Sequence, residues 1–204
     1  MKNKFHKAIC AEGMSKIMAK AFVVGIAGGS ASGKSTFCEQ LKNALTGYNI
    51  TTFHMDHYFK PKDMRPYVSA PITKKMYMDD NHPTTVNLSQ LKKDLSTTLN
   101  DAEIIIIEGL LTLFDDDICQ QLDLKLFIEC RADERIVRRL KRNMERGLTF
   151  DEISNVYLDM VRFRHDEYVE PSKWKADLIL NGSMFSGKAL EIIVGAIKSS
   201  ISER

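Results

Sequence analysis

The sequence predicts an α/β fold in which five parallel strands form one sheet with helices on both faces. Short, nearly continuous apolar runs alternate along the chain with segments whose apolar residues recur every three or four positions. Such alternation is typical of a parallel sheet covered by crossover helices. The chain has 204 residues and is 44% apolar, which is enough for one core of ordinary domain size.

The apolar runs give the expected strands, at residues 21–27, 50–56, 103–109, 124–130 and 177–182. Helices are expected between them, at residues 34–45, 87–99, 132–146, 150–169 and 186–199. Ligands of open parallel sheets gather at the carboxyl ends of the strands. The residues that follow each run are therefore the first candidates for a site.

Two segments depart from this regular pattern. Residues 1–20 are basic and lack an uninterrupted apolar stretch, which favours a helical arm over a signal peptide. Residues 21–204 then form a single domain. Within it, residues 57–86 are rich in Lys, Pro, Met and Tyr and too long for a simple connection, so we expect an irregular substrate loop over the active face.

Charge and cysteine content exclude several classes of protein. A formal charge of +2 gives no general case for binding nucleic acid or a membrane. The four cysteines are widely spaced and form no CxxC pair, so we expect free thiols and a cytoplasmic location. No run of 18 apolar residues occurs, and no transmembrane helix is expected. The expected partner is a small molecule, and homo-oligomerisation stays open.

A glycine-rich turn, GIAGGSASGKST, joins the first expected strand to the first expected helix. Its pattern Gly28-x-x-x-x-Gly33-Lys34-Ser35 is that of a P-loop, whose backbone amides and helix N-terminus cradle phosphate groups. The fold is thus expected to be that of a P-loop NTPase with ATP and Mg²⁺ as cofactors. Lys34 would reach the β- and γ-phosphates, and Ser35 would ligate Mg²⁺. The residues expected to bind ATP are Gly28, Gly29, Ser30, Ala31, Ser32, Gly33, Lys34, Ser35 and Thr36.

Two carboxylates stand at expected strand ends. Asp56 closes the second strand, where it is placed to take a proton from a substrate hydroxyl during phosphoryl transfer; a turn-forming aspartate is the alternative. Glu108 ends the run IIIIEG, and a charge there is costly unless it faces a cation, which suggests a role in holding Mg²⁺. A loop or helix-capping carboxylate is its alternative.

A basic helical stretch, RADERIVRRLKRNMERG, follows the fourth expected strand. Its arginines recur at spacings of three and four, so several share a face. We expect a lid over residues 132–149, in which Arg142 and Arg146 stabilise the transferring phosphoryl group. Arg135 is expected on the surface, and a merely solvated charged face is the alternative. Among the histidines only His82, in DDNHP, is a candidate for ligand contact, and a turn-forming role is equally compatible.

The chain contains six motifs in the order GGSASGKST, MDHYFK, DNHP, IIIIEGLLTLFDDDICQQLDLKLFIEC, RRLKRNMERG and RFRHDEYVEPSKWKADLILNG. In these motifs and their order the chain resembles the uridine kinase family of the phosphoribulokinase/uridine kinase group. That family transfers the ATP γ-phosphate to the 5′-hydroxyl of uridine or cytidine. The resemblance implies that Asp56 is the catalytic base, that Tyr58 adjoins the nucleoside and that Asn81 takes the place of a ribose-binding aspartate. Arg139, Arg142 and Arg146 match basic positions of the family's lid.

The chain also departs from the family. Leu148 and Val156 replace an expected arginine and glutamine. Residues 83–108 hold only one helix and one strand, where the family inserts a base-reading hairpin. The segment 60–81, with Tyr67, Met76, Tyr77 and Met78, is either a substitute wall for the base or packing within its own loop.

Three other functions stay open. A related kinase would act on another ribosyl or hydroxyl substrate, such as nicotinamide riboside or pantothenate. A P-loop regulatory NTPase is disfavoured because the chain lacks an N-K-x-D motif and carries Asp56. A nucleotide-binding module without activity is disfavoured by the joint presence of Lys34, Ser35, Asp56 and Glu108.

Overall fold

The computed structural model describes residues 20–204. The expected N-terminal arm, residues 1–20, lies outside the described residues apart from Lys20. No helix of residues 20–204 is long and apolar enough to span a bilayer. Of the four cysteines, Cys38, Cys119 and Cys130 are free and buried, as the spacing predicted.

Five parallel strands form the central sheet in the order β2–β5–β1–β6–β7, which confirms the predicted fold class. The strands are β1 (Phe22–Gly28), β2 (Ile50–His54), β5 (Ile104–Glu108), β6 (Leu124–Glu129) and β7 (Leu178–Asn181). β1 lies in the middle, and its Ile26 pairs with Glu108 of β5. The P-loop at the end of β1 therefore sits beside the carboxylate that ends β5.

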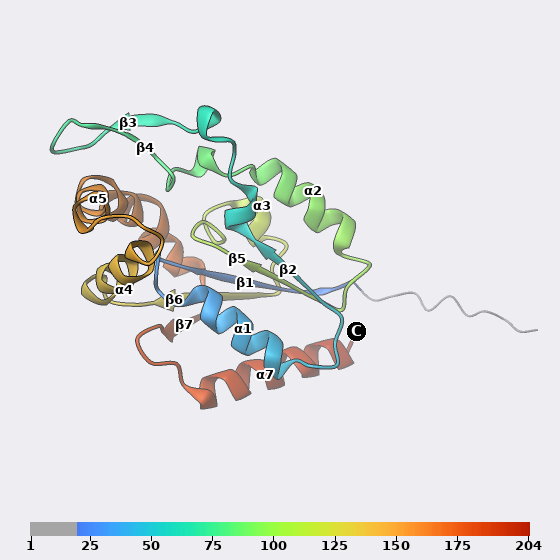
Figure 1. Ribbon diagram of the computed structural model, residues 1–204. Coiled ribbons are helices and arrows are strands. Elements are labelled where there is room, and N and C mark those ends of the chain that lie inside the picture. Colours follow the sequence, from blue (N-terminus) through green and yellow to red (C-terminus); the bar gives the residue numbers. More distant parts are fainter. Residues whose placement is uncertain (1–19) are drawn as a thin grey trace, which may run out of the picture.

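Helices cover both faces of the sheet (Figure 1). They are α1 (Lys34–Ala44), α2 (Leu88–Thr98), α3 (Asp116–Cys119), α4 (Ala132–Met144), α5 (Phe150–Val156), α6 (Arg162–Arg164) and α7 (Gly187–Ser202). Because side chains alternate along a strand, the isoleucines of β5 serve both cores. Ile104 and Ile106 pack with α1 and α7, while Ile105 and Ile107 pack with α2 and α3.

All four of these isoleucines are fully buried. Burial of each stabilises the fold by about 1.5–3 kcal/mol, so the run that predicted a strand also anchors the sheet. The helix ends follow their sequence signals in the same way. Asn87 caps α2 through the amide of Gln90, and Ser186 accepts from the amide of Ala189 at the start of α7.

The expected second strand is shorter than predicted. It ends at His54, and Asp56 lies in a 3₁₀ turn, Met55–Tyr58. The segment 57–86, expected to be irregular, contains two further 3₁₀ turns and an antiparallel hairpin of β3 (Tyr67–Ser69) and β4 (Met76–Met78). Its Tyr and Val residues favour strands, which accounts for the hairpin.

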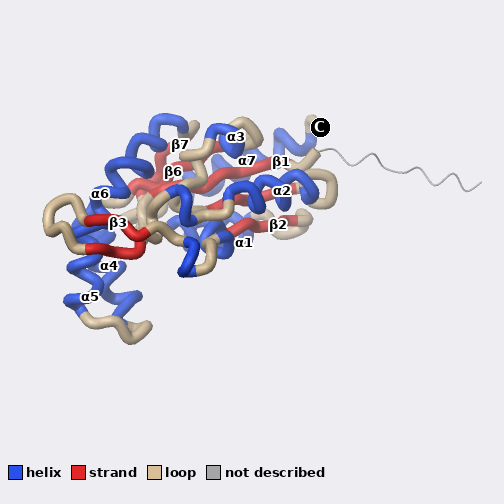
Figure 2. Tube along the Cα trace, turned by 90° about the horizontal axis from the view of Figure 1, so that it is seen from above, coloured by secondary structure: helices blue, strands red, loops and turns tan. Residues whose placement is uncertain are grey.

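The helix expected over residues 150–169 is continuous but not regular. π-helical segments, Tyr157–Val161 and His165–Val169, flank α6, and a 3₁₀ segment, Glu170–Lys175, follows them. Each π-helical turn accommodates one residue more than an α-helical turn. This altered periodicity decides which side chains of the helix face the hairpin. Figure 2 shows the hairpin beside the helices that follow β6.

Candidate active site

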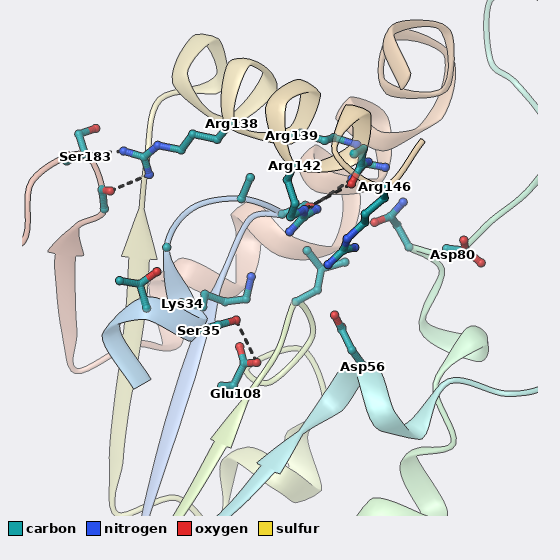
Figure 3. A pocket seen from close by; sticks show the side chains of 18 of the residues that line it. Lys34, Ser35, Asp56, Asp80, Glu108, Arg138, Arg139, Arg142, Arg146 and Ser183 are labelled. Carbon is teal, nitrogen blue, oxygen red and sulfur yellow. Dashed lines mark hydrogen bonds between the residues drawn. The ribbon is translucent and has the colours of Figure 1, made fainter. Parts of the chain in front are cut away.

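A cavity of about 890 Å³ lies at the carboxyl ends of the strands, below α4 (Figure 3). Its lining draws on the P-loop, the segment after β2, the end of β5, the lid and the turn after β7. The predicted residues among those that line it are Ser30, Ala31, Gly33, Lys34, Ser35, Thr36, Asp56, Asn81, Glu108, Arg139, Arg142 and Arg146. The prediction omitted Phe59, Asp80, Leu110, Arg138, Asn143, Gly182, Ser183 and Phe185.

The P-loop has the backbone that a phosphate cradle requires. Gly28 and Gly33 have φ angles of 144° and 104°, a region that favours glycine. A Cβ on Gly28 would stand 2.4 Å from the carbonyl oxygen of Ile128. α1 begins after Gly33 without a side-chain cap, which leaves the amides of its first turn available to an anion.

Lys34 lies over this loop. Its Nζ donates a hydrogen bond to the carbonyl oxygen of Gly29 at 3.0 Å. Burial lowers the pKa of Lys34, while the Glu108 and Asp56 carboxylates act in the opposite direction. Both carboxylates therefore lie close enough to affect the ammonium group that is expected to contact the phosphates.

Glu108 is buried at the end of β5, with 6% of its surface exposed. Its Oε1 accepts a hydrogen bond from the Ser35 hydroxyl at 3.2 Å and lies 2.9 Å from Nδ1 of His54. A hydroxyl and a carboxylate are oxygen ligands of the kind that Mg²⁺ prefers, and such sites use one or two carboxylates with substrate phosphates. Ser35 and Glu108 thus fit the predicted metal. The contact from His54 was not foreseen, although its place at a strand end could have indicated it.

The arginines of α4 form the opposite wall. Arg139 and Arg142 reach the hydroxyl of Ser30 at 3.1 and 3.5 Å, and Arg138 donates to the carbonyl oxygen of Gly182 at 2.9 Å. Figure 3 shows that Arg142 of α4 and Arg146, in the turn after α4, extend toward the space above Asp56. Burial lowers the pKa of Arg139 and of Arg142, and a neighbouring arginine adds to each effect. Clustered cations of this kind suit a polyphosphate chain.

Two predicted substrate residues lie elsewhere. The hydroxyl of Tyr58 donates to Asp94 of α2 at 2.9 Å, and burial together with this bond raises the pKa of Tyr58 to about 12. Phe59, the next residue, lines the cavity instead. Nδ1 of His82 accepts from the Thr84 amide at 3.2 Å, which supports the turn-forming alternative.

Arg135 corrects a further prediction. It was expected on the surface, but only 6% of it is exposed. Its Nε donates to the carbonyl oxygen of Cys130 at 3.0 Å, and a Cβ on Gly29 would meet its guanidinium at 2.5 Å. Arg135 therefore packs behind the P-loop. Its spacing of four residues from Arg139 was the signal that could have revealed this.

For the segment 60–81 the sequence left two alternatives open, a substitute wall for the base or packing within its own loop. Tyr67, Met76, Tyr77 and Met78 are absent from the cavity lining. Tyr67 and Met76 are 62% and 59% exposed, and the hydroxyl of Tyr77 is bound to Asp159. The loop-packing alternative therefore describes Tyr77.

Comparison with known proteins decides the family. The sequence model of the phosphoribulokinase/uridine kinase family matches residues 69–184. The chain belongs to the phosphoribulokinase/uridine kinase family. Uridine kinases of Bacillus cytotoxicus and Bacillus cereus are each 30% identical to it over 210 aligned positions, which cover 91% of this chain and 97% of each relative. As a member of this family, the chain is a small-molecule kinase.

Solved structures agree on the fold. A candidate fructose transport system kinase from a Silicibacter species matches with a TM-score of 0.59 over 78% of this chain and 89% of its own. A candidate uridine kinase from Bacillus stearothermophilus matches with a TM-score of 0.55 over 79% and 89%. Each is 19% identical, so these likenesses extend to the kinase fold alone.

Proposed function

We propose that this member of the phosphoribulokinase/uridine kinase family transfers the γ-phosphate of ATP to the 5′-hydroxyl of a nucleoside. Uridine and cytidine are the first candidates, because relatives of nearly the same length are uridine kinases. The observation that carries the proposal is the position of Asp56. It lines the same cavity as the phosphate-binding Lys34 and the lid arginines, and its charge acts on both Lys34 and Arg142.

In this proposal the donor site uses the P-loop and two metal-holding groups. The amides of residues 28–36 and the ammonium of Lys34 bind the phosphates of ATP. Ser35 and Glu108 would hold Mg²⁺, which neutralises charge that develops on the phosphates. His54 keeps the Glu108 carboxylate turned toward Ser35 through its contact at 2.9 Å.

The acceptor side uses carboxylates and an amide. Asp56 takes the proton of the acceptor hydroxyl as that oxygen forms its bond to the γ-phosphorus and ADP leaves. Asp80 and Asn81, which line the cavity, hydrogen-bond the ribose hydroxyls. Arg142 and Arg146 stabilise the negative charge of the transferring phosphoryl group.

The direct test is phosphate transfer from Mg²⁺-ATP to a panel of acceptors. The panel holds uridine, cytidine, purine nucleosides, nicotinamide riboside and pantothenate, and each is assayed with the parent and with Asp56→Asn. Asp63→Asn is the matched control, because Asp63 is an exposed carboxylate of the same segment. We expect nucleoside phosphorylation that depends on Asp56 and not on Asp63. If only nicotinamide riboside or pantothenate is phosphorylated, that compound replaces uridine and cytidine as the proposed acceptor. If ATP is hydrolysed and no acceptor is phosphorylated, the result favours a regulatory NTPase.

A further inference from the structure

We infer that Arg164 is a positioning residue for acceptor recognition, acting through its buried ion pair with Asp79. The inference rests on the proposed function, since it takes Asp80 and Asn81 to be acceptor-binding residues. Neither Arg164 nor Asp79 lines the cavity. Asp79 belongs to the motif DDNHP and Arg164 to the motif RFRHDEYVEPSKWKADLILNG, but neither was a predicted site residue.

Asp79 organises the turn that carries the acceptor residues. Its amide donates to the carbonyl oxygen of Pro66 at 2.9 Å, and its own carbonyl oxygen accepts from the Thr85 hydroxyl at 2.6 Å. Its Oδ1 accepts from the amide of Asn81 at 3.1 Å. The carboxylate therefore fixes the backbone that directs Asp80 and Asn81 into the cavity.

The other oxygen of this carboxylate is paired with Arg164. Nε of Arg164 donates to Oδ2 of Asp79 at 2.6 Å, and the Asp79 side chain has no exposed surface. The same guanidinium also pairs with Glu167 and lies 5.6 Å from the ring centre of Tyr168. Among the described residues, Arg164 is the one cation that forms an ion pair with Asp79.

Loss of Arg164 would thus leave a buried carboxylate without its cation. An uncompensated buried charge is strongly unfavourable, so Asp79 would have to move toward water or take up a proton. A carboxyl that moves away gives up its bond to the Asn81 amide. We therefore expect the acceptor turn to lose its fixed position while the P-loop, which Arg164 does not contact, keeps its own.

A second contact joins the same two segments. Asp159, in the π-helical segment Tyr157–Val161, accepts hydrogen bonds from the Tyr77 hydroxyl at 2.7 Å and the Thr73 hydroxyl at 2.9 Å. Both donors belong to the β3–β4 hairpin region, which lies above α5 in Figure 1. A two-stranded hairpin is marginally stable by itself, so the hairpin depends on this contact. The helix after the lid thus holds the acceptor segment at two points.

Steady-state kinetics of three variants test the inference. Arg164→Met is expected to raise the KM for the acceptor at least about tenfold and to leave the KM for ATP within about twofold. Arg164→Lys keeps a cation and should recover part of the acceptor KM. Arg131→Met is the control, because the Arg131 side chain is 78% exposed and its ion pair is with Asp133, outside the acceptor segment. Equal changes in both KM values, or none, would overturn the positioning role.

Hydrogen exchange gives a readout that needs no substrate. In Arg164→Met, amides of residues 66–86 should exchange faster, while those of β5 and the P-loop should not change. Unchanged protection over residues 66–86 would contradict the inference even if the kinetics could not be measured. If the parent phosphorylates no acceptor, the proposed function fails and the exchange result still decides the positioning role. Should Arg164→Met fail to fold, Asp159→Asn tests the second contact by faster exchange confined to the hairpin.

Discussion

The carbonyl oxygen of Ser32 lies 2.3 Å from the point where a Cβ on Gly182 would stand. The turn after β7 is therefore packed directly against the P-loop, with no room for a side chain. The carbonyl oxygen of Glu129 lies 3.0 Å from the same point. Both obstacles are backbone atoms, so neither can rotate away as the tip of a side chain would.

Gly182→Ala should consequently displace the P-loop. We expect a loss of stability of about 1–3 kcal/mol, typical of overpacking, together with weaker ATP binding. Thermal unfolding and an ATP titration measure the two effects. Gly195→Ala is the control, because that glycine is helical and a Cβ there meets nothing within 4 Å, and it should gain about 0.5–1 kcal/mol. If Gly182→Ala were as stable as the parent, the P-loop backbone could move aside for the added methyl group without loss of stability.

Asp56→Asn should separate chemistry from binding. The amide cannot take the acceptor proton, so we expect kcat to fall by about 10²–10⁴-fold, as for removal of a general base. Asp56 is exposed at the cavity, and its loss should leave the fold and ATP affinity intact. Rapid-quench measurement of the first turnover, beside a nucleotide-binding titration, gives both quantities. A burst as fast as that of the parent would exclude Asp56 as the base.

Glu108→Gln should affect the metal dependence of the reaction. The substitution keeps the shape of the side chain but removes the negative charge that faces Ser35, so the Mg²⁺ concentration for half-maximal rate should rise about tenfold or more. Mg²⁺ titrations at saturating ATP make the measurement. Glu39→Gln, an exposed change on α1, serves as the comparison and should leave the titration unchanged. If the Mg²⁺ titrations of the parent and of Glu108→Gln were identical, Glu108 would not be a residue that holds the metal.

His165 should make the fold sensitive to mild acid. Burial lowers the pKa of His165 to about 4, with the Arg135 cation adding to the effect and Glu170 and Asp166 opposing it. In the unfolded chain the pKa of this histidine is about 6.5. As the pH falls, His165 therefore takes up a proton in the unfolded state before it does so in the folded state. The stability present above about pH 6.5 is therefore lost progressively toward about pH 4.

Between about pH 7 and about pH 5 this loss should amount to about 2 kcal/mol. Urea unfolding at several pH values measures it. His165→Gln should remove most of the pH dependence in this window, whereas His57→Gln, at an exposed position, should retain it. If the free energy of unfolding depends on pH in the same way in the parent and in His165→Gln, groups other than His165 cause the acid sensitivity.

The sheet and the phosphate-binding loop were predictable because local sequence determines them. Buried parallel strands read as continuous apolar runs, and the run IIIIE became β5 with every residue buried. The P-loop depends on residues that are adjacent in the chain, so its spacing alone placed Lys34 and Ser35 in the cavity.

The acceptor side was less predictable because it depends on contacts between distant segments. Tyr58 and His82 are polar aromatic residues beside the site in sequence, yet Asp94 and Thr84 bind them. The sequence predicted Arg135 on a charged surface, whereas in the structure its guanidinium packs against Gly29 of the P-loop. In each case the partner of the side chain decided its role, and that partner comes from the folded chain rather than from the local motif.

The π-helical segments make the acceptor turn dependent on the winding of the helix that holds it. A π-helical turn contains one residue more than the α-helical turn it replaces, and each residue of an α-helix advances by about 100°. If all residues of Tyr157–Val161 were wound as an α-helix, Arg164 would be rotated away from Asp79 by roughly 100°, whereas deletion of one of them would restore regular winding and leave Arg164 facing Asp79. The contact between Arg164 and Asp79 thus depends on the extra residue being taken up as a π-helical turn.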